Sequence, residues 1–211
     1  MTSFLDKYGD MLLKASLVHL QYVLTSVGIA FVIALIVGIL LSRAPNISRA
    51  VIPLLGIFQT IPGLIFIGVL FIYLGIKPIT VLVALTIYAI FPILKNTYTG
   101  IIGVDPSLKE AAKGCGMSDM QILFKVELPM AMNPIISGLR MATIYTVSWA
   151  VLAAMIGLGG LGEFVYRGIE TNNQVLIIGG AIPSAIIALG LGYLIDYVHK
   201  KITPRGLQGG A

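Results

Sequence analysis

The feature that most constrains this chain is a series of five apolar runs, each close to the roughly 20 residues that a helix needs to cross a lipid bilayer. Only 11% of the residues are charged, whereas a soluble domain carries about 25%, so a water-soluble globular fold is excluded. The sequence therefore predicts an all-α membrane protein with five transmembrane helices in one domain of residues 1–211. The expected spans are residues 20–42, 51–74, 79–95, 131–156 and 175–197.

Small residues recur every four positions in the first and last runs, which offers flat faces for close helix packing. These residues are Ala30, Ala34 and Gly38 in the first run, and Ser184, Ala188 and Gly192 in the last. The second run contains Pro62, which removes a backbone hydrogen bond, so we expect a bend there. A bend of this kind is found in gates and also in ordinary membrane packing.

The basic residues are scattered between the apolar runs and give the chain a net charge of +5. They form no contiguous basic stripe, so a nucleic-acid partner is not expected. Because cytoplasmic loops are enriched in Lys and Arg, the base-rich loops are assigned to the cytoplasm, with the N-terminus outside and the C-terminus inside. The base-rich loops carry Arg43, Arg49, Lys95, Lys109, Lys113, Lys125, Lys200, Lys201 and Arg205, and the other loops carry Lys7, Lys14, Lys77 and Arg167.

The charged segments divide the chain further. Residues 1–17 are expected to form a separate helix on the outer leaflet, because their apolar side chains share one helical face. Spans one to three follow in residues 18–104, and spans four and five occupy residues 131–198. Residues 105–130 form a cytoplasmic segment between them, and residues 199–211 form a cytoplasmic tail.

The segment at 105–130 is longer than two antiparallel helices need as a connection. Asp105 followed by Pro106 is a helix start, and Gly114 and Gly116 end that helix. Ser118 with Gln121 is a capping-box pattern for a second short helix, which we expect to end before Pro129. Its apolar side would contain Met120, Leu123, Phe124 and Leu128, with Asp119, Lys125 and Glu127 facing elsewhere. Such a helical pair either docks a cytosolic partner or only connects the two spans.

Seven residues of this segment match the EAA motif: Glu110, Ala111, Ala112, Gly116, Val126, Leu128 and Pro129. The chain therefore resembles the integral membrane permease of bacterial type I ABC importers, with Val126 in place of the usual isoleucine. Three further stretches resemble the osmoprotectant branch, whose permeases import glycine betaine, carnitine or choline. They are PILKNTYTG at 92–100, GLGGLGEFVYRG at 157–168 and TPRGLQ at 203–208.

The resemblance implies the type I permease fold in a bacterial plasma membrane, with ATP-driven alternating access. It implies a second permease subunit, identical or homologous, and two cytoplasmic ATPase subunits that bind ATP and Mg²⁺, so this chain would hold no cofactor. It also implies an extracellular or periplasmic substrate-binding protein, or a fused binding domain. The residues expected to couple the ATPase to transport are Glu110, Ala111, Ala112, Gly116, Ser118, Leu128 and Pro129. A methionine or other amino-acid importer shares the EAA pattern and stays open as an alternative.

Other chemistries find little support. The chain has no GxxxxGK[ST] phosphate-binding loop, and its GxGxxG at 157–162 follows a membrane span, so we interpret it as a corner before a short helix at 163–169. His19 and His199 are expected at opposite membrane faces, as interfacial residues that share no metal. The predicted spans lack paired acidic residues, which disfavours both a membrane enzyme and a secondary carrier.

A few polar and aromatic residues of the spans are candidates for the transport pathway or a gate. They are Gln59, Thr60, Pro62, Asn96, Arg140 and Trp149. Arg140 would either reach the interface or a loop carbonyl, which we favour, or act in an inner gate. Aromatic side chains could also contact a quaternary ammonium group through cation–π interactions, although Tyr and Trp are common near any membrane interface. These aromatic residues are Tyr73, Tyr88, Tyr98, Tyr145, Trp149 and Tyr166.

Overall fold

The computed structural model describes residues 2–202, and within that range it contains helices and no strand, which confirms the all-α class. The expected tail at 203–211 and the matching stretch at 203–208 lie outside the described residues. The α-helices are α1 (Thr2–Ser42), α2 (Pro45–Phe58), α3 (Gly63–Leu74), α4 (Pro78–Ile102), α5 (Pro106–Gly114), α6 (Asp119–Ile122), α7 (Leu128–Met130), α8 (Met132–Ala150), α9 (Gly162–Glu170) and α10 (Gln174–Ile202). A π-helical segment, η1 (Leu123–Glu127), and a 3₁₀ segment, η2 (Val151–Ile156), complete the order.

Three helices are long and apolar enough to cross a membrane, namely Phe4–Ser42, Pro78–Ile102 and Gln174–Lys201. Two bent pairs pass the same test together. Helices α2 and α3 are bent by 95° around residues 59–62, and the α6–α7 region is bent by 61° relative to α8. Counting each bent pair as one span gives five, the number that the sequence predicts, although the second pair begins at Asp119 and the expected fourth span at residue 131. The bend at Pro62 is confirmed, and it amounts to a break in the helix.

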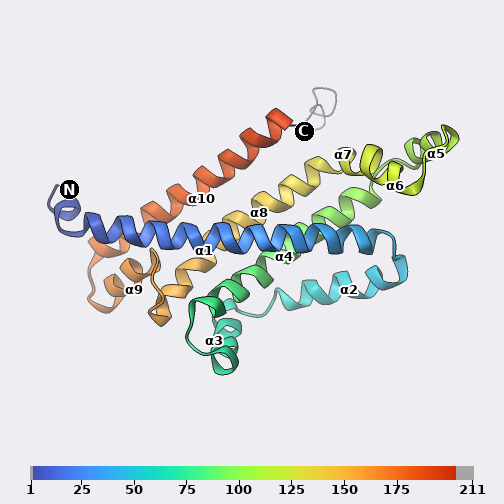
Figure 1. Cartoon of the computed structure of the whole chain (residues 1–211). Coiled ribbons are helices and arrows are strands. Elements are labelled where there is room, and N and C mark those ends of the chain that lie inside the picture. The colour runs from blue at the N-terminus through green and yellow to red at the C-terminus, as the bar shows by residue number, and fades with distance from the viewer. Residues whose placement is uncertain (1, 203–211) are drawn as a thin grey trace.

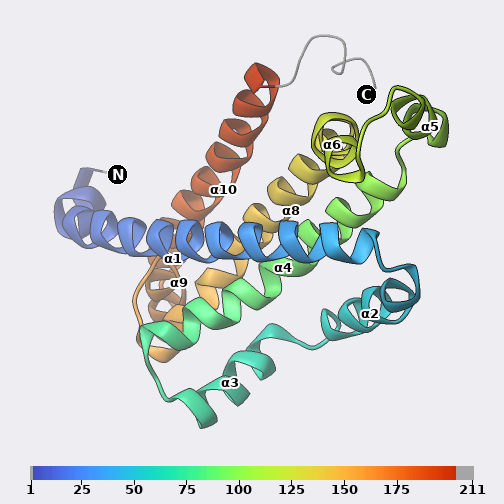
Figure 2. The same cartoon turned by 45° about the vertical axis from the view of Figure 1, so that its right-hand side comes forward.

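The core of the bundle lies where α4 packs between α1 and α8 (Figures 1 and 2). Ala30 and Ala34 of α1 are fully buried. At Gly38 a Cβ atom would lie 2.9 Å from Cβ of Thr97, so only glycine allows this approach of α1 to α4. Gly138 of α8 similarly lies against α4, where a Cβ would be 2.8 Å from the Pro92 carbonyl oxygen. The small-residue face predicted for the first span is therefore a real packing face.

Two predicted boundaries are wrong. Residues 2–17 are not a separate helix, because α1 runs unbroken from Thr2 to Ser42, and no Gly or Pro interrupts residues 15–27. The second short helix does not end before Pro129 but continues to Met130. The Leu128 N–H bonds to the Leu123 carbonyl five residues back, and a proline, which lacks an N–H, is tolerated directly after this wider turn.

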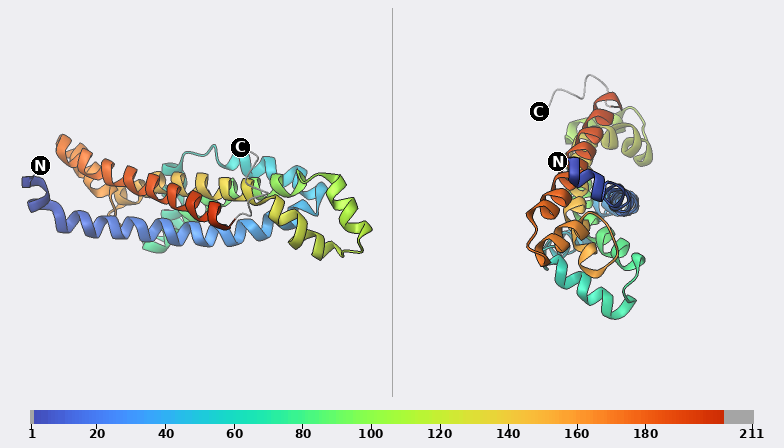
Figure 3. Two further views of the ribbon diagram at one scale, coloured as in Figure 1. Left: turned by 90° about the horizontal axis from the view of Figure 1, so that it is seen from above. Right: turned by 90° about the vertical axis from the view of Figure 1, so that its left-hand side faces the viewer.

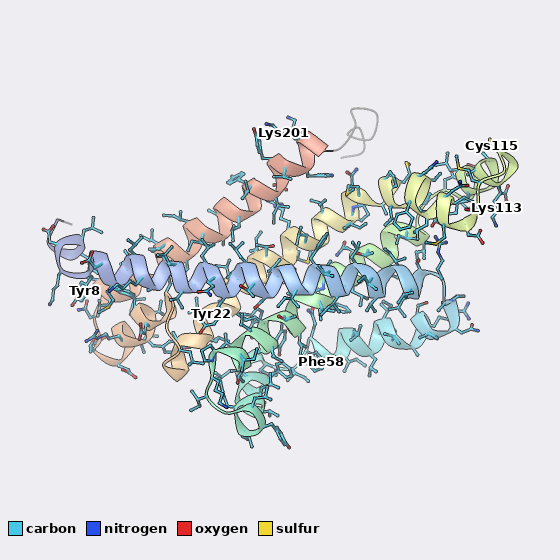
Figure 4. The ribbon with its side chains drawn as sticks, viewed as in Figure 1. Tyr8, Tyr22, Phe58, Lys113, Cys115 and Lys201 are labelled. Atoms are coloured by element: carbon cyan, nitrogen blue, oxygen red, sulfur yellow. The ribbon has the colours of Figure 1, made fainter. Side chains whose placement is uncertain are left out.

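The bundle is elongated along α1 (Figure 3). The start of α1 and α9 lie at one end, and α5 to α7 project at the other end, beyond the end of α1 (Figures 1 and 3). Figure 4 shows Tyr8 at the first end and Lys113 and Cys115 at the tip of the second. The end of α1 and the segment at 105–130 thus lie at the same end of the molecule. Both belong to the side that the sequence predicts to be rich in basic residues.

Candidate functional site

The EAA segment (residues 105–130) begins with a helix whose two ends are determined by local sequence. The Asp105 carboxylate accepts a hydrogen bond of 2.8 Å from the Ser107 N–H, and this bond holds the pKa of Asp105 below its usual value. Pro106 occupies the first turn. At the other end, Gly116 has φ +79°, a left-handed conformation that favours glycine. The predicted start and stop of this helix are confirmed.

Backbone bonds around Gly116 form a Schellman motif. The Met117 N–H bonds to the Ala112 carbonyl at 3.1 Å, and the Gly116 N–H bonds to the Lys113 carbonyl at 2.9 Å. Directly afterwards, the predicted capping box is present: the Ser118 N–H donates to Gln121 Oε1 at 2.9 Å, and the Gln121 N–H donates to the Ser118 hydroxyl. The turn between α5 and α6 is therefore defined by its own residues.

The motif residues divide between an outer and an inner side of the EAA segment. Glu110, Ala111, Gly116 and Ser118 are exposed, Ala112 is buried, and Leu128 and Pro129 are half-buried. The predicted apolar side is divided as well, because Leu123 is buried while Met120 and Phe124 are 62% and 59% exposed. The segment thus presents small and apolar side chains that no other part of residues 2–202 covers.

An ion cluster around the buried carboxylate of Glu127 joins the EAA segment to the rest of the bundle, and the sequence reasoning missed it. Only 1% of the Glu127 side chain is exposed. Both nitrogens of the Arg43 fork bond to its carboxylate, one at 3.1 Å, and Lys109 Nζ lies 3.3 Å from Oε1. Lys109 Nζ also donates to the Ile101 carbonyl at 3.3 Å. This Glu127 cluster (Arg43, Lys109 and Glu127) therefore ties α5 and η1 to the ends of α1 and α4.

The prediction that Glu127 faces away from the packed side is wrong. At about 100° per residue, even a regular α-helix places Glu127 between Leu123 and Phe124 on the apolar side, about 160° away from Lys125. In the structure Glu127 is buried and is the last residue of η1. The local sequence therefore indicates the packed side of Glu127 but not its cationic partners. The two cations of the cluster come from far away in the chain, 84 residues in the case of Arg43.

A second site lies at the break between α2 and α3. A pocket of about 300 Å³ is lined there by Gln59, Tyr88, Tyr145, Thr146 and Trp149, which we call the aromatic pocket. The rings of Tyr88 and Trp149 stack, with centroids 4.7 Å apart and planes at 15°. Figure 4 shows Phe58, the last residue of α2, beside this region, and its ring lies 6.1 Å from that of Tyr88.

Side-chain hydrogen bonds run in both directions between the break and α4. The Tyr88 hydroxyl donates to the Ile61 carbonyl at 2.8 Å, and the Gln59 amide donates to the Tyr88 carbonyl at 3.2 Å. Gly63, at the start of α3, leaves the space for Trp149, because a Cβ there would collide with the indole ring. Irregular backbone at membrane depth is tolerated where protein groups satisfy it or where it lines a cavity, and both apply here.

The other predicted pathway residues do not reach the aromatic pocket. Thr60 donates to the Ile57 carbonyl at 2.7 Å, Asn96 donates to the Pro92 carbonyl at 2.7 Å, and Pro62 caps α3. Arg140 Nε pairs with Asp196 Oδ2 of α10 at 3.2 Å, an ion pair between helices that the sequence analysis did not predict, and its expected reach to the interface stays a prediction. Of the six candidates only Gln59 and Trp149 line this pocket, and a transport role for any of them stays a prediction.

The glycine-rich stretch at 157–162 is a corner, as predicted. Gly157, Gly159 and Gly160 all have positive φ, and α9 follows at Gly162–Glu170. The Tyr22 hydroxyl of α1 donates to the Leu158 carbonyl at 3.1 Å and fixes this corner. His19 is fully buried against Gly160, and its expected depth at the membrane interface stays a prediction. The corner of residues 157–160, brought back onto α1 by the fold, covers it.

Comparisons with known proteins agree with this architecture. A family model described as "Binding-protein-dependent transport system inner membrane component" matches residues 18–206. The glycine betaine/carnitine/choline transport system permease protein OpuCB of Bacillus subtilis is 39% identical over 99% of this chain and 96% of its own length. The carnitine transport permease protein OpuCB of Listeria monocytogenes is 36% identical over 98% and 94%, and the choline transport system permease protein OpuBB of Bacillus subtilis is 38% identical over 97% and 94%.

A solved structure with a similar fold is an inward-facing form of the MetNI methionine ABC transporter. It superposes with a TM-score of 0.75 at 25% sequence identity, over 93% of this chain and 96% of the compared chain. The fold of this chain is therefore similar to that of a chain in a solved ABC transporter.

Proposed function

The chain belongs to the family of binding-protein-dependent transport system inner membrane components, and from this premise we propose that it carries a quaternary-ammonium compatible solute into a bacterial cell. Glycine betaine, carnitine and choline are the solutes of this class that we propose. The chain is a permease subunit of an ABC transporter, in which ATPase activity resides in separate subunits. We propose that ATP and Mg²⁺ bind there and that this chain holds no cofactor.

One observation carries the substrate class: three relatives whose names state these solutes are 36% to 39% identical to this chain over at least 97% of its length. A methionine or other amino-acid substrate is the second candidate, favoured by the fold shared with the methionine transporter. It ranks second because the two chains share only 25% sequence identity, and a shared fold at that identity indicates architecture rather than substrate.

The proposed assembly contains a second permease copy or a homologous subunit, two ATPase subunits and a substrate-binding protein or fused domain outside the cell. The EAA segment is the proposed ATPase docking surface, with Glu110, Ala111, Gly116 and Ser118 on its exposed side. The proposed topology places this end of the bundle, and the C-terminus, in the cytoplasm and the start of α1 outside. Exposed apolar side chains at Met120 and Phe124 support docking over a merely connecting role.

A docked motor acts on the spans only through groups that connect α5 to them. The Glu127 cluster provides that connection, because it joins α5 and η1 to Arg43 at the end of α1, and Lys109 also bonds to the end of α4. A displacement of α5 is thereby passed to the two helices that form the centre of the bundle. We propose that this movement switches the paired permeases between outward-open and inward-open states.

Reconstitution of the whole complex tests the proposed function. Proteoliposomes would contain the permease and ATPase subunits, with ATP inside and the loaded binding protein outside. We expect ATP-dependent uptake of radiolabelled glycine betaine, carnitine or choline and no uptake of methionine. Uptake of methionine in place of these solutes, or uptake driven by an ion gradient without ATP, would contradict the proposal.

A further inference from the structure

The aromatic pocket has the size and position of a small ligand site. Its volume of about 300 Å³ lies at the lower end of the range for ligand pockets. It lies at the break between α2 and α3, and residues of α4 and α8 complete its lining. Three of its lining side chains are aromatic, two are neutral and polar, and none is an acid or a base of the Asp, Glu, Lys or Arg type.

The rings of this pocket are held in place before any ligand arrives. Tyr88 stacks on Trp149, and the edge-to-face ring of Phe66 lies 5.2 Å from Tyr88. The hydrogen bonds of Tyr88 to Ile61 and of Gln59 to the Tyr88 carbonyl fix the same side chains to the backbone. A preorganised pocket loses little entropy when a ligand enters, so weak contacts are enough for transient binding.

The chemistry of the lining selects for one kind of cation. A quaternary ammonium group has no N–H to donate, and aromatic rings attract it through their electron-rich faces. A primary ammonium group would lose its hydrogen bonds to water and find no carboxylate among these lining residues, so its entry is costly. Gln59 uses one N–H for the Tyr88 carbonyl, and its second N–H is suited to a carboxylate or hydroxyl of the same solute.

We infer that the aromatic pocket is a transit site in the permease itself, where Tyr88, Tyr145 and Trp149 contact the quaternary ammonium group of the solute during translocation. This inference rests on the proposed function and names the subsite that the solute occupies. Because no fixed counter-charge is present in the lining, binding is weak enough for the solute to leave toward the cytoplasm, as conduction requires.

Trp149 is the only tryptophan of the chain, so its fluorescence reports on the pocket directly. The first experiment titrates the purified full-length permease in lipid nanodiscs with choline, and with ethanolamine as the primary-ammonium probe. We expect a saturable change in Trp149 emission with choline and none with ethanolamine. Tyr145→Leu should weaken the apparent affinity for choline roughly three- to tenfold, the range expected for the loss of one cation–π contact. Tyr145→Phe keeps the aromatic ring and should keep the wild-type affinity.

The second experiment measures solute transported per ATP hydrolysed in the reconstituted complex, at saturating loaded binding protein. Tyr145→Leu and Trp149→Leu should lower this ratio, and Tyr145→Phe should preserve it. Tyr193→Leu is the matched control, because Tyr193 is 70% exposed on α10 and lies outside the pocket lining. If Trp149→Leu reduces the amount of protein in the membrane, the comparison of Tyr145→Leu with Tyr145→Phe decides. Tyr145 is 50% exposed, so its replacement should disturb the packing less.

Two outcomes separate this inference from the proposed function. In the first outcome, the wild-type complex and both leucine variants transport quaternary ammonium solutes equally well, and choline and ethanolamine change Trp149 emission alike. This outcome refutes the transit site and leaves the proposed function standing. If the wild-type complex transports no such solute, the proposed function itself is refuted, and the transit site with it.

Discussion

Glu127 is a buried carboxylate that connects the EAA segment to the rest of the bundle. A buried charge is costly unless it is paired, and here Arg43, directly after α1, and Lys109 of α5 share one carboxylate. Arg43 is 46% exposed, so water screens part of its interaction and the pair is weaker than a fully buried one. The cluster still connects Lys109 of α5, through Glu127, to Arg43 directly after α1.

We predict that Glu127→Gln lowers the stability of the purified permease by about 1–3 kcal/mol, because Arg43 and Lys109 keep their charges and lose their anion. Thermal unfolding in detergent measures this change, and transport per ATP hydrolysed should fall as α5 loosens. Glu110→Gln is the matched control, since Glu110 is exposed on the same segment and the permease alone should not be destabilised by its loss. Equal unfolding temperatures for the two variants would contradict the assigned role of Glu127.

Gly116 is a residue whose backbone conformation, φ +79°, most side chains avoid. We predict that Gly116→Val distorts the Schellman turn at a cost of about 1–2 kcal/mol, leaves the protein in the membrane, and uncouples ATP hydrolysis from transport. Gly114→Ala is the control, because Gly114 is helical and a Cβ there meets open space. Transport and substrate-stimulated ATPase activity that both stay at the wild-type level in Gly116→Val would rule this role out.

At the scale of elements, two irregular helical regions lie at the candidate sites: the break between α2 and α3, and the π-helical segment η1. Gln59 at the break donates to the Tyr88 carbonyl of α4, and the Tyr88 hydroxyl donates to the Ile61 carbonyl at the break. Glu127, the last residue of η1, bonds to Arg43 directly after α1. Residues of irregular helix therefore contribute to both candidate sites.

We predict that Gly63→Ala displaces Trp149, because the added methyl group occupies the space of the indole ring. The fluorescence maximum of the single tryptophan should shift, and transport of the proposed solute should fall. Gly68→Ala on the same helix, where a Cβ meets open space, should leave the spectrum unchanged. An unshifted spectrum in Gly63→Ala would mean that Trp149 does not pack on Gly63.

Local sequence predicts the parts of this fold that local interactions determine. Asp105, Gly116 and the Ser118–Gln121 box act within a few residues of themselves, so their caps and turns are readable in advance. The Glu127 cluster and the Tyr88–Trp149 stack join residues far apart in the chain, so the partners cannot be assigned from local sequence. Gln59 and Trp149 are identified as pathway candidates from residue type alone, and only tertiary packing shows that they share a pocket.

At the scale of the whole molecule, the two candidate sites are separate and the fold connects them. The EAA segment lies at one end of the bundle, away from the break between α2 and α3 (Figure 2). The aromatic pocket lies at this break, and residues of α4 and α8 complete its lining. Helix α4 runs between them, because it carries Tyr88 in the pocket and its end bonds to Lys109 of the Glu127 cluster. Movement imposed on α5 therefore has a direct structural route to the proposed solute path.

The central claim is that the EAA segment is a cytoplasmic docking surface for an ATPase, and Cys115 permits a direct measurement of it. Cys115 is the only cysteine of the chain, and it is exposed beside Gly116 (Figure 4). A membrane-impermeant maleimide should label it in inside-out vesicles and not in right-side-out vesicles, and labelling should slow when the ATPase subunits are bound. Labelling of Cys115 in right-side-out vesicles would contradict the account. A labelling rate that is the same with and without bound ATPase subunits would contradict it as well.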